Sequence, residues 1–286
     1  MIIPLHSLLS VTLLPPLYNH FLPTPRAQLA DNDRLDIVLV SPRNPLNIGA
    51  VARAMANFGL SRLSVVAPYA PHWREARSAV GAPQLLAAAT ETPTLAEAVA
   101  HCTLVLGTGT LTYRKPEQPV VALPDLANLV LQELTRGGRI ALVFGPEKHG
   151  LTREDLALCH LLVEIPTDPR QPSMNLGQAV AVCLYELSSR AFQPAIGSSV
   201  NAPQNLLPPP APQHPASPSA HLELLAQLVE ETMLAAGYSP ASMREANKHD
   251  LRLLLRRLAP TSRDTRRILG LFRRILWRLK RVPKRD

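Results

Sequence analysis

Short apolar segments alternate with segments of helical periodicity from Asp36 to Phe192, and this alternation restricts the chain to few folds. Each apolar segment lacks polar alternation, as strands do when both faces of their sheet are covered. The expected strands are Asp36–Val40, Arg62–Val66, Thr103–Gly107, Ile140–Phe144 and Leu161–Ile165. The expected helices are Ile48–Phe58, Pro83–Ala89, Leu95–Ala100, Asp125–Thr135, Thr152–Leu158 and Asn175–Phe192. Strands that alternate with helices predict an α/β domain with a mainly parallel sheet.

Residues 193–221 form the clearest boundary in the chain. This segment is rich in proline and contains no aromatic residue, so it cannot build a core and is expected to be a semi-extended linker. We predict a disordered leader in residues 1–33, the α/β domain in 34–192, the linker in 193–220 and a helical extension in 221–286. The linker is expected to leave the orientation of the extension variable.

The helical extension is strongly basic. Apolar residues recur at helical spacing in Leu222–Val229, Leu251–Leu258 and Ile268–Leu279, which predicts a small bundle of three amphipathic helices. The chain has a net charge of +8, and residues 244–286 contain fifteen Lys and Arg against four Asp and Glu. A basic module joined to a nearly neutral domain is typical of an enzyme that acts on a polyanion. Alternatively, Arg266–Lys280 is an amphipathic helix for a membrane surface.

Several classes of protein are disfavoured by simpler features. The apolar leader has no early basic residue and is interrupted by prolines, so we expect no signal peptide or membrane segment and place the protein in the cytoplasm. Cys102, Cys159 and Cys183 lack C-x-x-C spacing, so we expect buried thiols, with neither disulfides nor a metal site. Gly107 and Gly109 follow a strand, but the third glycine of a dinucleotide-binding motif is missing.

The first informative motif begins at Asn47, after the first expected strand. It has Asn47, Gly49 and Arg53 in the spacing N-x-G-x-x-x-R, and Asn47 is expected to cap the helix that follows. Arg53 lies among alanine and valine and is the only charged residue between Arg43 and Arg62. It is either a functional cation or an arginine that extends from a half-buried helix to solvent.

The second motif follows the fourth expected strand. It reads F-G-x-E-x-x-G, and its two glycines, Gly145 and Gly150, enclose Glu147. Glycine allows a backbone to approach a ligand closely. The alternative is an ordinary turn between a strand and a helix. The helix after this turn should begin with a capping box formed by Thr152 and Asp155.

The third motif has the spacing S-x-N-x-x-x-A and leads into the last helix of the domain. Ser173 is a candidate cap for that helix, and Asn175 and Ala179 follow it. A helix N-terminus presents backbone N–H groups to a bound ligand. The alternative is a proline-rich loop that ends in a good helix cap.

In this order and spacing, the three motifs resemble the signature motifs of the SpoU branch of the SPOUT RNA 2′-O-methyltransferases. The resemblance covers Asp36–Phe192. It implies a SPOUT-type α/β domain with a deep C-terminal trefoil knot, S-adenosyl-L-methionine as the cofactor, and a homodimer whose second subunit completes the active site. The extension resembles the helical C-terminal region of members that methylate tRNA, most clearly in Thr232–Tyr238 and Arg266–Ile275.

The resemblance also implies a role for particular residues. The positions implied to contact the cofactor are Thr108, Gly109, Thr110, Gly145, Ile165, Pro172, Ser173 and Met174. Arg53 is implied as the central catalytic group, which positions the RNA and stabilises the developing alkoxide. Glu147 would orient Arg53 or Asn47, and Ser173 and Asn175 would hold the loop of the third motif. The arginines expected to face outward and bind RNA are Arg256, Arg257, Arg266, Arg267, Arg273, Arg274 and Arg278.

Three functions are compatible with these residues. The first is 2′-O-methylation of tRNA at nucleotide 32, a C or U that opens the anticodon loop. The second is the same reaction on rRNA. The third is RNA binding without catalysis, which the complete set of motif residues argues against. The reaction implies no metal ion.

Overall fold

The computed structural model describes residues 32–109, 116–191 and 215–281, so the expected leader and most of the expected linker lie outside the described residues. One sheet has the strand order β3-β2-β1-β6-β4-β7-β5. Its strands are β1 (Leu35–Val40), β2 (Leu63–Val66), β3 (Thr90–Thr92), β4 (Leu104–Thr108), β5 (Val120–Ala122), β6 (Ile140–Phe144) and β7 (Leu161–Glu164). Each of these pairings is parallel, which confirms the α/β class.

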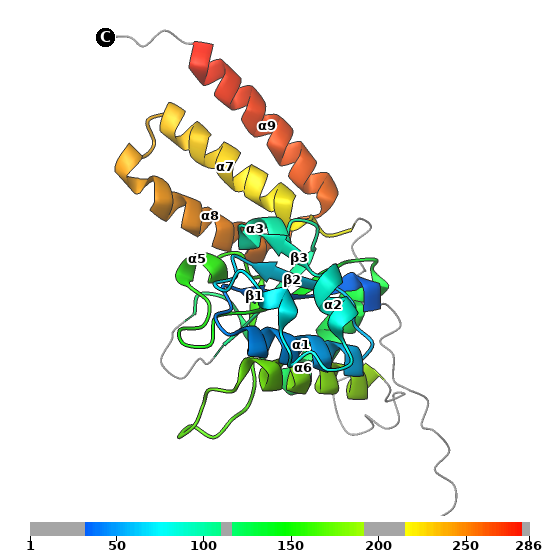
Figure 1. Ribbon diagram of the computed structural model, residues 1–286. Helices are drawn as coiled ribbons and strands as arrows, with labels where there is room; N and C mark the ends of the chain where they lie inside the picture. Colours follow the sequence, from blue (N-terminus) through cyan, green and yellow to red (C-terminus); the bar gives the residue numbers. More distant parts are fainter. Residues whose placement is uncertain (1–31, 110–115, 192–214, 282–286) are drawn as a thin grey trace, which may run out of the picture.

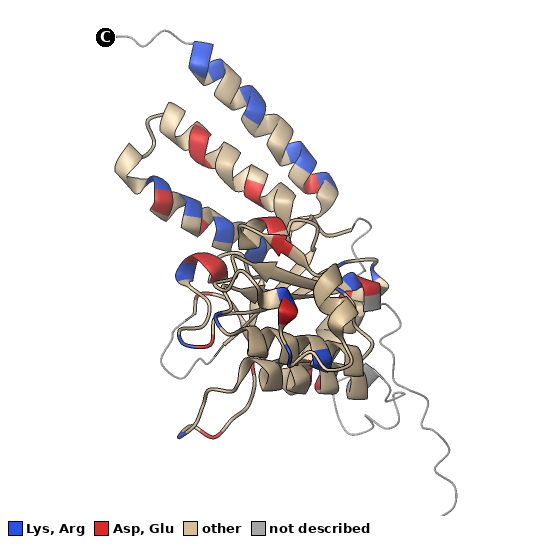
Figure 2. Ribbon diagram, viewed as in Figure 1, with Lys and Arg blue, Asp and Glu red and all other residues tan. Residues whose placement is uncertain are grey.

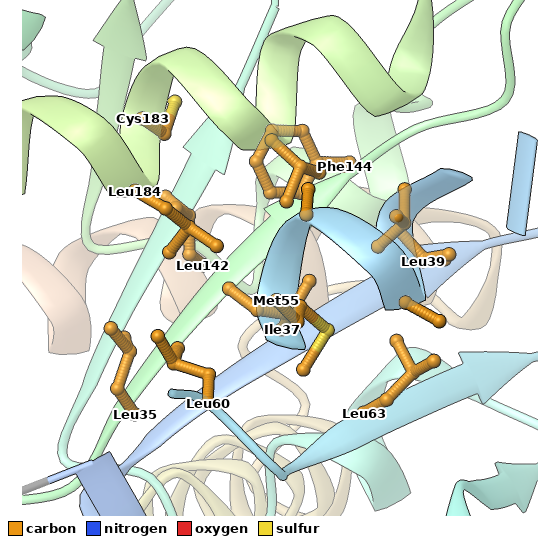
Figure 3. Packing of buried hydrophobic residues seen from close by; sticks show 14 of the residues in the cluster. Leu35, Ile37, Leu39, Met55, Leu60, Leu63, Leu142, Phe144, Cys183 and Leu184 are labelled. Carbon is orange, nitrogen blue, oxygen red and sulfur yellow. The ribbon is translucent and has the colours of Figure 1, made fainter. Parts of the chain in front are cut away.

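Helices cover both faces of this sheet (Figure 1). The helices of the α/β domain are α1 (Pro45–Asn57), α2 (Pro83–Ala88), α3 (Leu95–Ala98), α4 (Leu123–Thr135), α5 (Arg153–Leu156) and α6 (Leu176–Ala191). Successive side chains of β1 enter different cores. Leu35, Ile37 and Leu39 pack with α1 and α6 (Figure 3), whereas Val38 and Val40 pack with α3 on the opposite face. This double burial explains why β1 has no polar alternation.

The five predicted strands are present, with ends that differ by one residue at most. Two further strands, β3 and β5, were not predicted. They form the two edges of the sheet and contain only three residues each, Thr90–Thr92 and Val120–Ala122. Most of their side chains are exposed or half-buried, so they carry neither a continuous apolar run nor a usable alternation.

The first helix begins earlier than expected, and Asn47 is not its cap. Asn44 is the N-cap, and its side-chain oxygen accepts a hydrogen bond from the backbone N–H of Leu46 at 2.9 Å. Pro45 occupies the first helical position, where its missing N–H costs nothing. Gly59, with a φ of 73°, follows the helix end as expected.

The other two expected caps have different outcomes. The capping box of Thr152 and Asp155 is present at α5, as predicted. Ser173 does not cap α6, because the side-chain oxygen of Asn175 accepts the N–H of Gly177 at 2.9 Å instead. Asn175 therefore occupies the cap position that the sequence predicts for Ser173.

The extension forms an open three-helix arrangement. Its helices are α7 (Ser219–Ala235), α8 (Arg244–Leu258) and α9 (Ser262–Arg281). In Figure 1, α7 lies between α8 and α9, and a small core joins Leu225 and Ala226 of α7 to Leu255 and Leu269. The predicted apolar stripes are only partly covered, and Leu271 on α9 remains 58% exposed.

The extension contacts the α/β domain directly, which argues against the variable orientation expected from the linker. The N–H of Ser219 donates to the carbonyl of Cys102 at 2.9 Å, and the N–H of Ala220 donates to that of Ala100 at 2.9 Å. The imidazole of His249 on α8 lies 3.7 Å from the carboxylate of Glu117. These contacts attach the extension to the α/β domain.

Arg256 was expected to face outward, and this expectation is wrong. Its residue is only 3% exposed, and its guanidinium donates to the carboxylate of Glu223 at 3.1 Å and to the hydroxyl of Ser219 at 3.3 Å. Arg252 donates to the same carboxylate at 2.6 Å. Arg256 therefore joins α8 to the start of α7, whereas Arg257 is exposed.

The knot that the resemblance implies stays a prediction. The connection after β4 includes residues 110–115, which lie outside the described residues. Within the described ranges, no helix is both long and apolar enough to span a membrane.

Arg256 and Arg257 provide a matched pair for testing the attachment of α8 to α7. We expect Arg256→Ala to lower the free energy of unfolding by about 3 kcal/mol, because it removes a buried guanidinium and its ion pair with the half-buried carboxylate of Glu223. Arg257→Ala should change it by less than about 0.5 kcal/mol, as is usual at exposed positions. Urea denaturation followed by circular dichroism measures both. Equal stability of the two variants would contradict the structural role of Arg256.

Candidate active site

A cavity of about 730 Å³ lies at the carboxyl edge of the sheet. It lies where the chain leaves β4, β6 and β7, and β4 is the neighbour of both other strands. The described residues that line it are Thr108, Gly109, Phe144, Gly145, Pro146, Glu147, Lys148, His149, Gly150, Glu164, Ile165, Pro166, Thr167, Pro169, Pro172, Ser173, Met174, Leu176 and Ala179. Ligands of open α/β sheets bind outside the carboxyl ends of the strands. The cavity is therefore the candidate active site.

Most of the residues expected to contact a cofactor line this cavity. They come from the three loops and are Thr108, Gly109, Gly145, Ile165, Pro172, Ser173 and Met174. Thr110, the remaining expected position, lies outside the described residues. The parallel register explains their convergence, because each follows the end of a central strand.

The three motifs are joined by two hydrogen bonds. The side-chain amide of Asn47 donates to Glu147 Oε1 at 2.7 Å. The amide of Asn175 donates to Asn47 Oδ1 at 3.0 Å. The Oδ1 atom of Asn175 caps α6. The two hydrogen bonds therefore fix the second motif to the starts of α1 and α6.

Glu147 also holds the turn before α1. Its carboxylate accepts the backbone N–H groups of Arg43 at 3.2 Å and Asn44 at 3.4 Å. Burial raises the pKa of Glu147, but the hydrogen bonds from Asn47 and from backbone N–H groups outweigh burial and bring the pKa below its usual value. Of the two partners expected for Glu147, the structure brings Asn47 to it and not Arg53.

Arg53 lies away from the cavity of its own chain. It is exposed on α1 and is not among the described lining residues. On the same side of α1, Ala50 is in close contact with α6, since a Cβ added to Gly177 would lie 2.8 Å from the Ala50 Cβ. One chain therefore places Asn47, Glu147, Ser173 and Asn175 at or beside the cavity but leaves Arg53 on an outer surface.

Gly145 is required by a close backbone approach. A Cβ at this position would lie 2.3 Å from both the Gly150 carbonyl carbon and the Leu151 nitrogen. A side chain cannot avoid these backbone atoms by rotating, so the loop of the second motif can close only over glycine. This closure forms the wall of the cavity that carries Glu147.

Three ionisable lining residues were not predicted. Lys148 and His149 lie inside the second motif, at positions that its pattern leaves unspecified, and Glu164 is the last residue of β7. The position of Glu164 at the carboxyl end of a central strand was an available signal. For Lys148 and His149 the sequence offered only their proximity to Glu147.

A separate polar cluster lies at the amino edge of the sheet. Asp36, His101 and Cys102 have ligand atoms within 4.8 Å of one another, which is close enough for a metal ion. However, the buried carboxylate of Asp36 is already hydrogen-bonded to Arg62 and His101, and Arg139 lies 3.8 Å away. Burial raises the pKa of the Cys102 thiol, which keeps it protonated. A cation there would meet guanidinium groups, so we assign the cluster a structural role.

Glu147→Gln tests the contribution of the carboxylate to the site. The glutamine amide offers one acceptor oxygen where the carboxylate serves three N–H donors, so we expect a lower melting temperature at pH 7. Since the pKa of Glu147 is lowered by folding, its stabilising effect is present above its unfolded pKa and disappears as the pH falls through its folded pKa. Differential scanning calorimetry should show the two proteins beginning to converge as the pH falls below the ordinary glutamate pKa of about 4.3. A constant difference at all pH values would contradict this role.

Comparison with known proteins agrees with this geometry. Residues 34–185 match the SpoU rRNA Methylase family. The tRNA (cytidine/uridine/adenosine-2'-O-)-methyltransferase TrmJ of Pseudomonas aeruginosa is 44% identical over 156 residues, which are 54% of this chain and 60% of that relative. The tRNA (cytidine/uridine-2'-O-)-methyltransferase TrmJ of Pectobacterium atrosepticum is 33% identical over 85% of this chain and 95% of its own length.

Solved structures show the same relationship. The crystal structure of TrmJ from Z. mobilis ZM4 has a TM-score of 0.69 and 31% sequence identity. The similarity covers 84% of this chain and 98% of that chain, so it includes the helical extension as well as the α/β domain. The match to the family over more than half of the chain, together with the joined motifs, leads to one conclusion. This chain belongs to the SpoU rRNA methylase family.

Proposed function

We propose that the protein transfers a methyl group from S-adenosyl-L-methionine to a ribose 2′-hydroxyl of tRNA. The observation that carries this proposal is the meeting of all three motifs at one cavity, through Glu147, Asn47 and Asn175. The relatives named TrmJ, which match most of the chain, are tRNA 2′-O-methyltransferases. A tRNA substrate is consistent with a cytoplasmic location.

The cavity suits the proposed cofactor. Its volume of about 730 Å³ lies within the usual range for small-molecule sites. Its walls combine apolar side chains, such as Ile165 and Met174, with backbone exposed at Gly109 and Gly145. These loops would hold the cofactor largely through backbone groups, with Thr108, Pro172 and Ser173 completing the contacts. The cofactor, when bound, supplies an activated methyl group on a sulfonium.

The chain's own residues must position the ribose and help its proton to leave. A 2′-hydroxyl is a weak nucleophile because it keeps its proton at neutral pH. Negative charge develops on the 2′-oxygen as its proton passes to water. The oxygen would then bond to the methyl carbon while the carbon–sulfur bond of the sulfonium breaks and the neutral thioether leaves. A guanidinium beside the 2′-oxygen stabilises this charge and can bind the adjacent phosphate with two hydrogen bonds. We assign this role to Arg53.

Arg53 can fulfil this role only if a second copy of the chain completes the site. The outer surfaces of α1 and α6 carry exposed apolar side chains, namely Leu46 at 54%, Val182 at 37% and Tyr185 at 63%. Arg53 lies on the same surface. We therefore propose a homodimer with two-fold symmetry in which α1 and α6 form the interface and Arg53 reaches the partner's cavity.

A mixing experiment tests the position of Arg53. Arg53→Ala, and to a lesser degree Arg53→Lys, should lose methyl transfer while cofactor binding, measured by calorimetry, is unchanged. Gly109→Phe should block the cavity and still fold, because a Cβ at Gly109 meets nothing within 4 Å. Each variant alone should be inactive. Refolding them together should restore about a quarter of wild-type activity, since half of the dimers would then contain one intact site.

Three results would contradict this assignment. If Arg53 acted within its own chain, the mixed dimers would contain no intact site and no activity would return. A monomeric mass by light scattering at micromolar concentration would also exclude the shared site. If Arg53→Ala keeps its activity, another residue has the catalytic role.

The basic extension is proposed to bind the body of the tRNA. Figure 2 shows that Lys and Arg positions recur along the α9 ribbon. Those that we expected to bind RNA are exposed: Arg266, Arg267, Arg273, Arg274 and Arg278. Arg257 on α8 is exposed as well, whereas Arg256 is withdrawn from this set by its burial. The extension would grip phosphates while the α/β domain receives a loop nucleotide.

Neutralising α9 tests this assignment. Changing Arg266, Arg267, Arg273 and Arg274 together to Gln should weaken tRNA binding and reduce the slope of log affinity against log salt by up to about 3. Arg136→Gln, at an exposed arginine of the α/β domain, is the control and should leave the slope unchanged. An unaltered slope in the fourfold variant would place the RNA contacts elsewhere.

The position on the RNA is the finest part of the proposal. The motifs and the extension resemble those of enzymes that modify nucleotide 32, so we propose a C or U at that position. The second candidate is rRNA, which the description of the family favours. Ribose-methylation mapping of total RNA from cells with and without the gene decides between them. Loss of a methyl group from rRNA alone would overturn the tRNA assignment.

A further inference from the structure

Tyr69 and Arg43 form an exposed pair beside the candidate site. Tyr69 is 77% exposed, although burial of its large apolar ring would be favourable. The guanidinium carbon of Arg43 lies 5.7 Å from the centre of that ring. A single exposed aromatic residue needs no explanation. An aromatic ring beside an arginine, however, suits a nucleic acid, whose planar bases stack on rings and whose phosphates bind arginine.

The backbone holds this pair in place from both sides. Tyr69 follows β2 and Arg43 follows β1, and the N–H of Tyr69 donates to the carbonyl of Pro42 at 3.2 Å. The two turns contain left-handed residues that are not glycine, Ser41 with φ 44° and Ala67 with φ 42°. Such conformations are strained for residues with a Cβ, and they persist where the surrounding structure enforces them, often at binding sites.

The pair is connected to the cavity through one residue. The backbone N–H of Arg43 donates to Glu147 Oε2 at 3.2 Å, and Glu147 both lines the cavity and binds Asn47. The Arg43 side chain is not used in that bond and is exposed. Tyr69 and the cavity both lie where parallel strands end at the carboxyl edge of the sheet, so an RNA segment with one nucleotide in the cavity has the Tyr69 ring on the same edge.

We propose that Tyr69 stacks on an unpaired base next to the nucleotide that is methylated, with Arg43 contacting the same segment of backbone. This inference rests on the proposed function. Unpaired bases of RNA loops are recognised by stacking on aromatic rings and by arginine, which does not require a particular base. The pair therefore adds a binding position for the loop, separate from the cofactor cavity and from the basic extension.

Steady-state methylation of an unmodified tRNA transcript tests the stacking. Tyr69→Ala should raise KM for tRNA about tenfold and change kcat little, with unchanged affinity for S-adenosyl-L-methionine. Tyr69→Phe should behave as wild type, because it keeps the ring and loses only the hydroxyl. Tyr69→Leu should resemble Tyr69→Ala, since it keeps apolar bulk without a ring face. Val80→Ala, at an apolar residue that is 64% exposed before α2 and outside the cavity lining, is the control and should keep the wild-type KM.

The outcomes separate this inference from the proposed function. If the wild-type protein methylates no RNA, the proposed function fails. If it does and Tyr69→Ala keeps the wild-type KM, the stacking platform is wrong. A wild-type KM for Tyr69→Leu would also overturn it, because contact without an aromatic ring would then suffice. If Tyr69→Ala melts at a lower temperature, the comparison of Tyr69→Phe with Tyr69→Leu decides alone.

Discussion

Strand β6 is the element on which the rest of this structure depends. It pairs in parallel with β1 on one side and β4 on the other, and all five of its side chains are buried. Because parallel strands need covered faces, this pairing requires helices on both sides of the sheet. It also places the end of β6 between the ends of β1 and β4, so the loop that carries Gly145 and Glu147 has neighbours on both sides. The cavity is a direct result of that register.

The site is organised by polar side chains whose first role is local. Asn175 caps α6, and Glu147 accepts the N–H groups that precede α1. Asn47 has hydrogen-bonding groups left over for both, and so connects them. Each bond contributes little alone, but a chain of bonds restricts three loops at once. A cofactor or RNA segment would then meet a preformed site, with less conformational entropy left to lose on binding.

The extension combines attachment with charge. Arg256 and Arg252 share the carboxylate of Glu223, which joins α8 to α7, and the start of α7 is hydrogen-bonded to the α/β domain at Cys102. The arginines of α9 are exposed on this attached extension, and Figure 2 shows their positions along the helix. Basic residues in a set position can select a folded RNA by the arrangement of its phosphates. Basic residues without a set position would only attract RNA of any shape.

The sequence alone determined the α/β class, the five central strands, the family and most of the loop residues that line the cavity, because these depend on apolar runs and on motif spacing. It could not reveal β3 and β5, whose three residues pair only at an existing sheet edge. It also could not separate Arg256 from Arg257, or Asn44 from Asn47 as a cap, since neighbouring residues of one type differ only in the direction they face. Tertiary structure decided those directions, and with them the position of Arg53 outside its own cavity, because packing of α1 against α6 fixes which side of the helix is covered.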